Sequence, residues 1–572
     1  MYKNCYVQRG DEWNHYRIHL WTDEGYIEEE FQNYGYQECS PQQATHRGLK
    51  GEPLQKVFNW QRENPQMHYS DHTRGNIHTK FLIDKYGDDD TPSVTHREVF
   101  FDIEIEMGGA LTPDYIKQAP KPVTSIAWWD KQLDDWKIVI VDKEGKIEHT
   151  VDSQGREVIP VKRETDLLDV FIRQMEEIQP DILIGYNSDY FDIPYLYYRI
   201  KNTMGDLTVK RLSPIQVIEE RHWDEDMPIR IAGVASLDYM RLHKKYSFKD
   251  EPSYKLDSLG EKYVDQKKIE YKGSLDRLFA EDKEKFIEYN FVDVLILKKL
   301  DEKFKYIDLT KNLAHKGKVL YEEVYQSSRI HDGAISSWLI SQGIVPPNKD
   351  LDPLTKKNYA GGYLFCPRTG IYKYMFDEDL TSLYPSIIMS LNIGKETYVG
   401  RVLDLFDDRN NRLGLNDLEA MVAKDAEATI PVENTQRKQQ HMRVKDIVDK
   451  IKSNNLAVTA NGVMFRTDKK SALSVILDTW FDERVRYKKA MKKAYKSGNK
   501  KEGELNHLKQ YTMKILLNSL YGATALPSFR YGSVILSEGI TLTGQRIIQE
   551  SALFANTHMN KVMRGEINLE LD

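Results

Sequence analysis

A segment of alternating character, residues 98–106, most constrains how this 572-residue chain can fold. Because successive side chains of a strand point to opposite faces, this alternation predicts a strand with one face on a core and three carboxylates on the other. A solvated strand face is the ordinary alternative, since like charges at this spacing repel one another. The apolar members are Val99, Phe101, Ile103 and Ile105, and the acidic members are Asp102, Glu104 and Glu106.

Further periodic segments surround this strand and predict an α/β block. Short apolar runs at 123–129, 136–141 and 182–185 indicate strands, and residues 166–178 and 282–300 have helical character. Turn signals divide the chain before and after the block. The acidic turn Gly87-Asp-Asp-Asp-Thr-Pro92 and the pair Pro346-Pro347 mark the two breaks.

Composition excludes several classes of protein. The net charge of -7 is an average that hides local basic clusters, so it decides little about nucleic-acid binding. Cys5, Cys39 and Cys366 lie far apart, which argues against a disulfide framework and against a zinc site. The start of the chain lacks a signal-peptide pattern and no run approaches 18 apolar residues, so we expect a cytoplasmic protein without membrane contact.

Two distant segments change the interpretation of the acidic strand. Residues 186–192, Tyr-Asn-Ser-Asp-Tyr-Phe-Asp, follow the apolar run 182–185, which puts Asp192 at the carboxyl end of a strand, where α/β sheets bind ligands. Tyr289 and Asp293 are spaced i, i+4 and share one face of a helix. In this order, the three segments resemble the Exo I, Exo II and Exo III motifs of DEDD-type 3′-5′ exonucleases that carry a tyrosine.

This resemblance implies a two-metal site. Four carboxylates would hold two divalent ions about 4 Å apart, and hard oxygen ligands favour Mg²⁺ or Mn²⁺. Tyr289 would orient the attacking water, Asn187 would support the site or the substrate DNA, and Glu106 would be peripheral. The implied metal ligands are Asp102, Glu104, Asp192 and Asp293.

A second acidic cluster lies in residues 376–386, Phe-Asp-Glu-Asp-Leu-Thr-Ser-Leu-Tyr-Pro-Ser. This segment resembles motif A of family B DNA polymerases, and residues 514–522, Lys-Ile-Leu-Leu-Asn-Ser-Leu-Tyr-Gly, resemble motif B. The resemblance is to the polymerases of large tailed phages. The resemblance implies that Asp379 binds the metal ions of a polymerase site, which would also hold two ions. It implies further that Leu380 and Leu383 contact the nucleotide. It also implies Tyr384 as the ring that rejects a ribose 2′-hydroxyl; a core tyrosine is the alternative.

The segment 473–522 is helical and basic, with Ser497-Gly-Asn499 as the turn of a two-helix finger domain. A basic run is usually a solvated face, but here it would line the nucleotide site. By resemblance, Arg484, Lys488, Lys514 and Asn518 contact the dNTP, and Tyr521 and Gly522 lie beside the base pair and the DNA. The Tyr359-Ala-Gly361-Gly362 segment resembles an element of this family that contacts the template strand. By the same resemblance, residues 216–236 correspond to the exonuclease hairpin that helps to part primer from template; an ordinary surface hairpin is the alternative.

The expected fold class is a mixed α/β and α+β multidomain chain: an N-terminal mixed β domain, a ribonuclease H-like DEDD exonuclease, a partial palm sheet and two-helix fingers. The expected boundaries are an N-terminal domain at 1–96, completed by about 306–350, and an exonuclease at 97–305. The palm follows at 351–472, the fingers at 473–522 and a second palm segment at 523–572.

The Asp-Thr-Asp of motif C is absent from the sequence. We therefore expect half of a polymerase site, completed by a C-terminal fragment that carries motif C and the thumb; a natural split and a truncation would look identical. The expected function is a replicative polymerase portion with proofreading, acting on primer-template DNA, single-stranded DNA and dNTPs, with a possible sliding clamp, in the host cytoplasm if phage-encoded. A stand-alone exonuclease and a non-catalytic nucleic-acid-binding subunit are the rivals.

Overall fold

The structure is a computed structural model that describes residues 1–58, 67–70, 74–87, 89–221, 224, 226–247, 249–349, 361–365, 369–371, 375, 379–405, 413–526 and 528–566. The chain divides into two compact units, each built from two separate stretches. Unit 1 comprises 1–33 and 72–326, and unit 2 comprises 34–71 and 327–572. This division is coarser than the expected domain boundaries, which stay predictions. Within the described residues, no helix has the length and apolar character needed to cross a bilayer.

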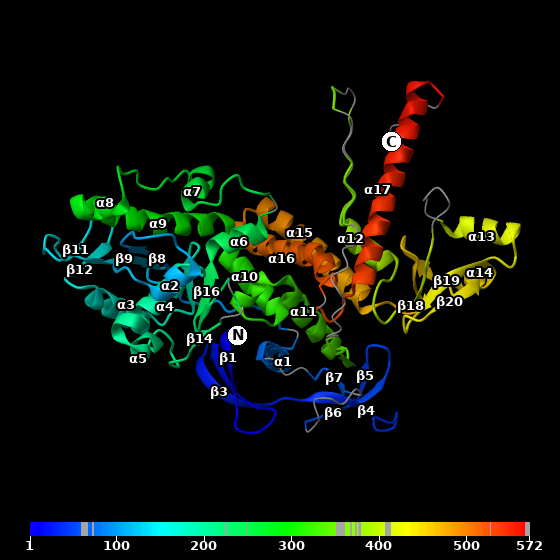
Figure 1. Ribbon diagram of the computed structural model, residues 1–572, viewed down its shortest axis with the longest axis horizontal. Helices are drawn as coiled ribbons and strands as arrows, with labels where there is room; N and C mark the ends of the chain where they lie inside the picture. Colours follow the sequence, from blue (N-terminus) through cyan, green and yellow to red (C-terminus); the bar gives the residue numbers. More distant parts are fainter. Residues whose placement is uncertain are drawn as a thin grey trace. The chain divides into compact units, whose positions relative to one another are not determined.

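Unit 1 begins with a three-stranded antiparallel sheet and continues with an α/β block (Figure 1). Its strands are β1 (Tyr2–Arg9), β2 (His15–Thr22), β3 (Gly25–Gln32), β8 (Glu98–Ile105), β9 (Val123–Asp130), β10 (Asp135–Val141), β11 (Thr150–Val151), β12 (Arg156–Val161), β13 (Ile182–Gly185), β14 (Ile218–Glu220), β15 (Ile229–Ile231) and β16 (Ala235–Asp238). Its helices are α1 (Arg74–Tyr86), α2 (Pro113–Gln118), α3 (Glu164–Ile178), α4 (Asp192–Met204), α5 (Asp206–Lys210), α6 (Tyr239–Tyr246), α7 (Leu256–Val264), α8 (Leu275–Glu281), α9 (Lys283–Phe304), α10 (Tyr306–Gly317) and the 3-10 helix η1 (Tyr321–Tyr325).

The α/β block is built on a seven-stranded sheet in the order β11-β12-β10-β9-β8-β13-β16. β8 pairs antiparallel with β9 and parallel with β13, and β13 pairs parallel with β16. The carboxyl ends of β8, β13 and β16 therefore lie at one edge of the sheet, where α/β sheets collect ligand-binding residues. The strands and helices expected in this block are present, each within a few residues of its expected bounds.

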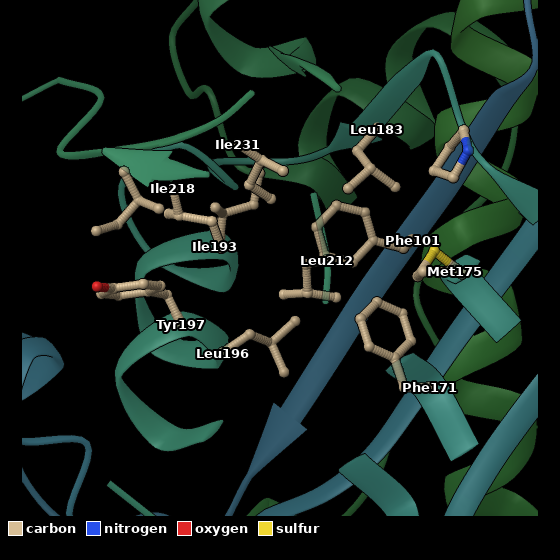
Figure 2. A pocket seen from close by; sticks show the side chains of 12 residues that line it. Phe101, Phe171, Met175, Leu183, Ile193, Leu196, Tyr197, Leu212, Ile218 and Ile231 are labelled. Carbon is tan, nitrogen blue, oxygen red and sulfur yellow. The ribbon is translucent and has the colours of Figure 1, made fainter. Parts of the chain in front are cut away.

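The alternation of β8 decides which face of the sheet meets the core. Val99, Phe101 and Ile103 are buried in a core that contains side chains of α3 and α4. In Figure 1, α3 and α4 lie across one face of the sheet and α9 runs along the other. Figure 2 shows Phe101 from this face at a cavity of about 20 Å³ lined by apolar side chains, so the acidic side chains of β8 point away from this core.

Residues 216–236 form the expected hairpin in part. β14 and β15 pair antiparallel, with Ile218 opposite Ile231. Residues 222–223 and 225 of the expected turn lie outside the described residues. A role of this hairpin in strand separation stays a prediction.

The described residues of unit 2 form two five-stranded sheets and a set of longer helices. Its first sheet has the order β17-β5-β6-β4-β7 and its second has the order β20-β19-β18-β22-β21. The strands are β4 (Gly35–Glu38), β5 (His46–Gly48), β6 (Pro53–Val57), β7 (Met67–His68), β17 (Ile344–Val345), β18 (Tyr398–Val402), β19 (Thr429–Asn434), β20 (Gln439–Arg443), β21 (Ala457–Val458) and β22 (Val463–Phe465). The helices are α11 (Ser327–Ser341), α12 (Leu383–Ser390), α13 (Leu415–Lys424), α14 (Val444–Ser453), α15 (Ala472–Lys496), α16 (Lys500–Thr524) and α17 (Val534–Met563).

The expected two-helix segment of 473–522 corresponds to α15 and α16. The turn between them contains Gly498 with φ +75°, a backbone conformation that glycine adopts without steric cost. Asn499 then caps α16, because its side chain accepts a hydrogen bond from the Glu502 N–H. Residues 374–379 also predict a strand that leads to Asp379, but residue 374 and residues 376–378 lie outside the described residues.

Candidate functional site

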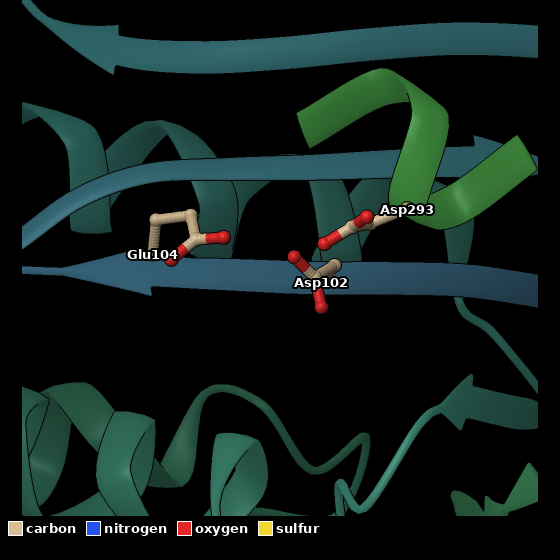
Figure 3. Close-up of side chains that lie close together, drawn as sticks. All are labelled: Asp102, Glu104 and Asp293. Atoms are coloured by element: carbon tan, nitrogen blue, oxygen red, sulfur yellow. The ribbon is translucent and has the colours of Figure 1, made fainter. Parts of the chain in front are cut away.

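Three carboxylates of unit 1 converge on the face of the sheet that carries α9. Asp102 and Glu104 project from β8 and Asp293 projects from α9 toward them (Figure 3). One oxygen from each lies within 4.8 Å of the others. The i, i+2 spacing on a strand puts the first two on one face, but only the packing of α9 against β8 brings in the third, 189 residues after Glu104.

Burial and mutual repulsion raise the pKa values of these acids. Burial raises the pKa of Asp102 well above its ordinary value, and the charge of Asp293 adds to the rise. Burial likewise raises the pKa of Glu104 to about 8, with Asp293 again the next cause. The pKa of Asp293 itself is raised to about 6 by burial, which Lys268 opposes. Without added positive charge, the group therefore tends to hold protons.

Lys268 is a site residue that the sequence patterns did not indicate. Its ammonium forms an ion pair with Asp293 and donates a hydrogen bond to the Tyr289 hydroxyl at 3.2 Å. The negative charges around it raise its pKa, chiefly that of Asp293, although burial acts in the opposite direction. A lysine between α7 and α8 has no periodicity that marks it as functional, so only the tertiary contact identifies it.

Asp192 and Asn187 lie on the turn that follows β13. Asp192 is the first residue of α4 and one of its oxygens accepts a hydrogen bond from the Ile103 N–H at 3.3 Å. Burial raises its pKa to about 7. Asp192 is not one of the three residues whose oxygens lie within 4.8 Å of each other. It lies beside Ile103, the β8 residue between the other two acids.

Asp238, which the sequence patterns also missed, holds this turn in place. It ends β16, opposite Gly185 of β13, and accepts a hydrogen bond from the Asn187 N–H at 3.0 Å. Asn187 adopts a left-handed φ of 62°. A Cβ on Gly185 would lie 2.5 Å from the Cβ of Ser188, so the tight turn requires glycine there.

The donor set fits divalent cations. Asp293 Oδ1 is buried and has no hydrogen-bond partner among the described residues. This oxygen therefore has a lone pair that can bind a cation. Carboxylate oxygens are hard donors that suit Mg²⁺ or Mn²⁺, and cations would relieve the repulsion that raises the pKa values. Asp102, Glu104 and Asp293 are the residues that would hold them.

In unit 2, the residues expected at a nucleotide site surround the start of α12. Asp379 and Leu380 are exposed just before this helix, and Leu383 is its first residue. The ring of Tyr384 lies 4.3 Å from the ring of Tyr521, measured between centroids. The structure therefore places Tyr384, expected to reject a ribose 2′-hydroxyl, next to Tyr521, expected to lie beside the base pair.

The expected phosphate-binding side chains occur on α15 and α16. Arg484 and Lys488 lie on α15, and the Arg484 Nε is buried without a hydrogen-bond partner in the described parts of the chain. An unpartnered guanidinium donor suits an anion. On α16, Lys514 lies over the Tyr511 ring and Asn518 is exposed.

Gly361 and Gly522 have open surroundings, and Gly362 lies close to Tyr384. Gln545 of α17 donates a hydrogen bond to the Gly361 carbonyl at 2.6 Å. A Cβ on Gly362 would lie 3.3 Å from the Tyr384 hydroxyl, and a Cβ on Gly522 would meet no atom within 4 Å. Tyr359 lies outside the described residues.

These features define a class of protein. One α/β unit carries an acidic face that suits divalent cations, and the other unit of the same chain carries aromatic and cationic side chains that suit a nucleotide. Two family models match the chain. The model described as DNA polymerase family B, exonuclease domain, matches residues 56–259, and the model described as DNA polymerase family B matches residues 320–571. The chain belongs to the family B DNA polymerases.

Similar proteins include polymerases of phages and archaea. The chain is 30% identical over 519 residues to a DNA-directed DNA polymerase of Escherichia phage RB69, an alignment that covers 82% of this chain and 55% of that protein. It is 28% identical over 460 residues to a DNA-directed DNA polymerase of Enterobacteria phage T4, covering 77% and 50%. A DNA polymerase of Thermococcus litoralis is 24% identical over 249 residues, covering 41% and 14%. The chain thus spans about half the length of the phage relatives.

Proposed function

We propose that this chain degrades single-stranded DNA from the 3′ end, using two divalent cations held by the acidic face of β8. The observation that carries the proposal is the convergence of Asp102, Glu104 and Asp293 around an unpartnered buried oxygen. The match to the exonuclease-domain model and the phage polymerases named above support it.

The chain's own groups have distinct tasks in the proposed hydrolysis. Bound cations would polarise the scissile phosphate and make a bound water more acidic. Tyr289 lies within hydrogen-bond distance of Lys268, so its hydroxyl is held where it can orient the attacking water. Attack of the water oxygen on phosphorus breaks the bond to the 3′-oxygen of the preceding nucleotide, which leaves with a proton, and releases a 5′-mononucleotide.

The test is digestion of a 5′-labelled oligonucleotide with Mg²⁺. Asp102→Ala/Glu104→Ala should remove most of the activity, because it removes both of the metal ligands that β8 is proposed to supply. The matched control is Glu144→Ala/Glu148→Ala, which removes the same charge from exposed positions after β10. Equal digestion by the wild type and the Asp102/Glu104 variant would contradict the proposal.

We also propose that the chain contributes to template-directed DNA synthesis. In this reaction the primer 3′-oxygen attacks the α-phosphate of a dNTP and pyrophosphate leaves. Asp379 would bind metal ions, and Arg484 and Lys514 would stabilise the phosphate charge. The 572 residues contain no Asp-Thr-Asp, so the remaining metal carboxylate would come from sequence outside them.

Exposed apolar side chains support a further palm segment as a partner. Leu364 is 96% exposed, Ile371 is 99% exposed and Phe554 on α17 is 73% exposed. Exposure of large apolar side chains to this degree suits a surface that another segment covers. We propose that the segment with motif C and the thumb covers it. The sliding clamp and the cytoplasmic location stay proposals, and the stand-alone exonuclease and the non-catalytic subunit remain alternatives that the two assays separate.

A further inference from the structure

A fixed loop, residues 265–274, connects α7 to α8 beside the carboxylates of β8. Its first half is tied to α7, because the Lys268 N–H donates to the Asp257 side chain at 2.8 Å and the Gln266 N–H donates to the Gly260 carbonyl at 3.2 Å. Its far end is tied to the chain after β8, because Asp276 at the start of α8 accepts from the Met107 N–H at 2.9 Å. The loop is therefore held on both sides of the site.

Tyr271 projects from this loop toward the reacting groups. Its ring meets the Tyr289 ring edge-on, with centroids 5.6 Å apart and planes at 83°. This is a favourable geometry for two aromatic rings. Burial raises the pKa of the Tyr271 phenol and the charge of Glu104 adds to the rise, so the phenol lies within the field of the carboxylates.

The same loop thus contacts Tyr289 in two ways. Lys268 binds its hydroxyl at 3.2 Å and lies over its ring, 5.1 Å from the centroid, while Tyr271 packs against the ring itself. A tyrosine hydroxyl that orients a water must keep one rotamer, since a displacement of 1 Å greatly lowers the rate. Two contacts from an anchored loop restrict both the ring plane and the hydroxyl position.

We propose that Tyr271 is a positioning residue of the exonuclease reaction, which holds the Tyr289 ring in the rotamer that orients the attacking water. The inference rests on the proposed exonuclease function. It assigns no DNA contact to Tyr271, so it predicts an effect on kcat with little effect on KM or on DNA affinity. It also predicts that the ring matters and the hydroxyl does not.

The experiment compares Tyr271→Leu with Tyr271→Phe in the full chain, using a labelled single-stranded oligonucleotide and saturating Mg²⁺. Tyr271→Phe keeps the edge contact and should stay within about 2-fold of wild-type kcat. Tyr271→Leu should lower kcat by about 10-fold, as loss of a supporting contact does at other sites, with KM unchanged. Affinity for the oligonucleotide in EDTA, read by fluorescence anisotropy, should be the same for all three proteins.

A double-mutant cycle with Tyr289→Phe tests whether Tyr271 acts through Tyr289. Once the Tyr289 hydroxyl is removed, the added Tyr271→Leu change should lower kcat by less than about 2-fold, because there is no oriented water left to lose. Additive effects, an unchanged kcat for Tyr271→Leu, or a change confined to KM or DNA affinity would each overturn the inference.

Controls separate this inference from the function beneath it. Tyr26→Leu is the matched variant, because Tyr26 is also partly exposed and packs against a neighbouring ring, Trp21, at 5.2 Å between centroids. Thermal unfolding of each variant identifies a loss of activity that comes from misfolding; if Tyr271→Leu misfolds, Tyr271→Met replaces it in the comparison and in the cycle. If the wild type does not degrade DNA, the proposed function and this inference both fail; if it does and Tyr271→Leu equals it, only this inference fails.

Discussion

At the scale of single residues, charge balance decides what the acidic face of β8 can do. Within the described residues, Lys268 is the one cation that forms an ion pair with these three carboxylates, through Asp293. One cation cannot neutralise several acids, so the pKa of Glu104 remains raised, at about 8. The group is therefore electrostatically prepared for divalent cations but competes for them with protons and with Lys268.

Replacing Lys268 tests this competition. We expect Lys268→Met to lower the exonuclease rate by about 10-fold to 100-fold, because Tyr289 loses its hydrogen-bond donor. The same change should lower the Mg²⁺ concentration needed for half-maximal activity, because a competing positive charge is removed. Titration of activity with Mg²⁺ measures both effects. The control is Lys267→Met, whose side chain is exposed and pairs with Glu261; a higher Mg²⁺ requirement for Lys268→Met would contradict the prediction.

The raised pKa values also predict how cation binding depends on pH. Below a carboxyl's pKa the group carries a proton that a cation must displace, so raising the pH from 6 to 9, through the pKa values of about 7 for Asp192 and about 8 for Glu104, should strengthen binding. The affinity should rise by up to about 10-fold per pH unit for each proton displaced. Calorimetry with Mn²⁺ in buffers of different ionisation enthalpy counts those protons. A pH-independent affinity would show that the carboxylates are already ionised.

At the scale of elements, a buried ion pair joins α11 to the segment after α16. Arg530, 2% exposed, donates to Asp332 of α11 at 2.7 Å and to the Pro347 carbonyl at 2.5 Å. Lys349 pairs with the same carboxylate at 3.1 Å. Burial alone would raise the pKa of Asp332, but the two cations outweigh it and hold the pKa at about 2.

Asp332→Asn should destabilise unit 2 by about 3–5 kcal/mol, because it leaves a buried guanidinium without its counter-charge. Urea unfolding, followed by fluorescence, measures the loss. Glu550→Gln, which breaks the exposed pair of Glu550 with Arg546 on α17, should cost less than about 1 kcal/mol. Equal losses for the two variants would show that burial does not strengthen the first pair.

The sign of the pH effect follows from the depressed pKa. The Asp332 carboxyl has a folded-state pKa of about 2 against about 3.9 for an unfolded aspartate, so its contribution to stability is complete above about pH 4. As the pH falls from about 4 to about 2 the contribution disappears. Wild-type protein should therefore lose stability over this interval more steeply than Asp332→Asn.

At the scale of the whole molecule, the proposed exonuclease site and the proposed synthesis site differ in completeness. Three carboxylates of the proposed exonuclease site converge within unit 1. The described part of unit 2 contributes Asp379 to the proposed synthesis site, and the phage relatives are about twice as long as the matched region. The two activities should therefore separate in an assay of these 572 residues.

We expect no primer extension by these residues alone and restored extension with a fragment that carries motif C and the thumb. Loss of one metal carboxylate removes several kcal/mol of transition-state stabilisation. The measurement is primer extension in an Asp192→Ala background, which we expect to silence degradation, with and without the fragment. The fragment alone is the control. Robust extension by the 572 residues alone would place the second carboxylate within them.

Local periodicity made much of unit 1 predictable from the sequence. The alternation of 98–106 and the i, i+4 spacing of Tyr289 and Asp293 determined which side chains share a face, because strand and helix geometry is fixed by the backbone. Motif resemblance selected the residues of the synthesis site, whose roles stay predictions. Residues 372–374 and 376–378 lie outside the described residues, so the expected strand before Asp379 remains untested.

The tertiary structure alone decided what surrounds those side chains. Lys268, Tyr271 and Asp238 belong to loops or strand ends without a diagnostic pattern, and they reach the site because α7 and α8 pack against α9 and β16 pairs with β13. Sequence periodicity reports only which face a residue occupies on its own element. The distances between elements, and with them the raised pKa values of Glu104 and Asp192, depend on how the core packs and how much water it excludes.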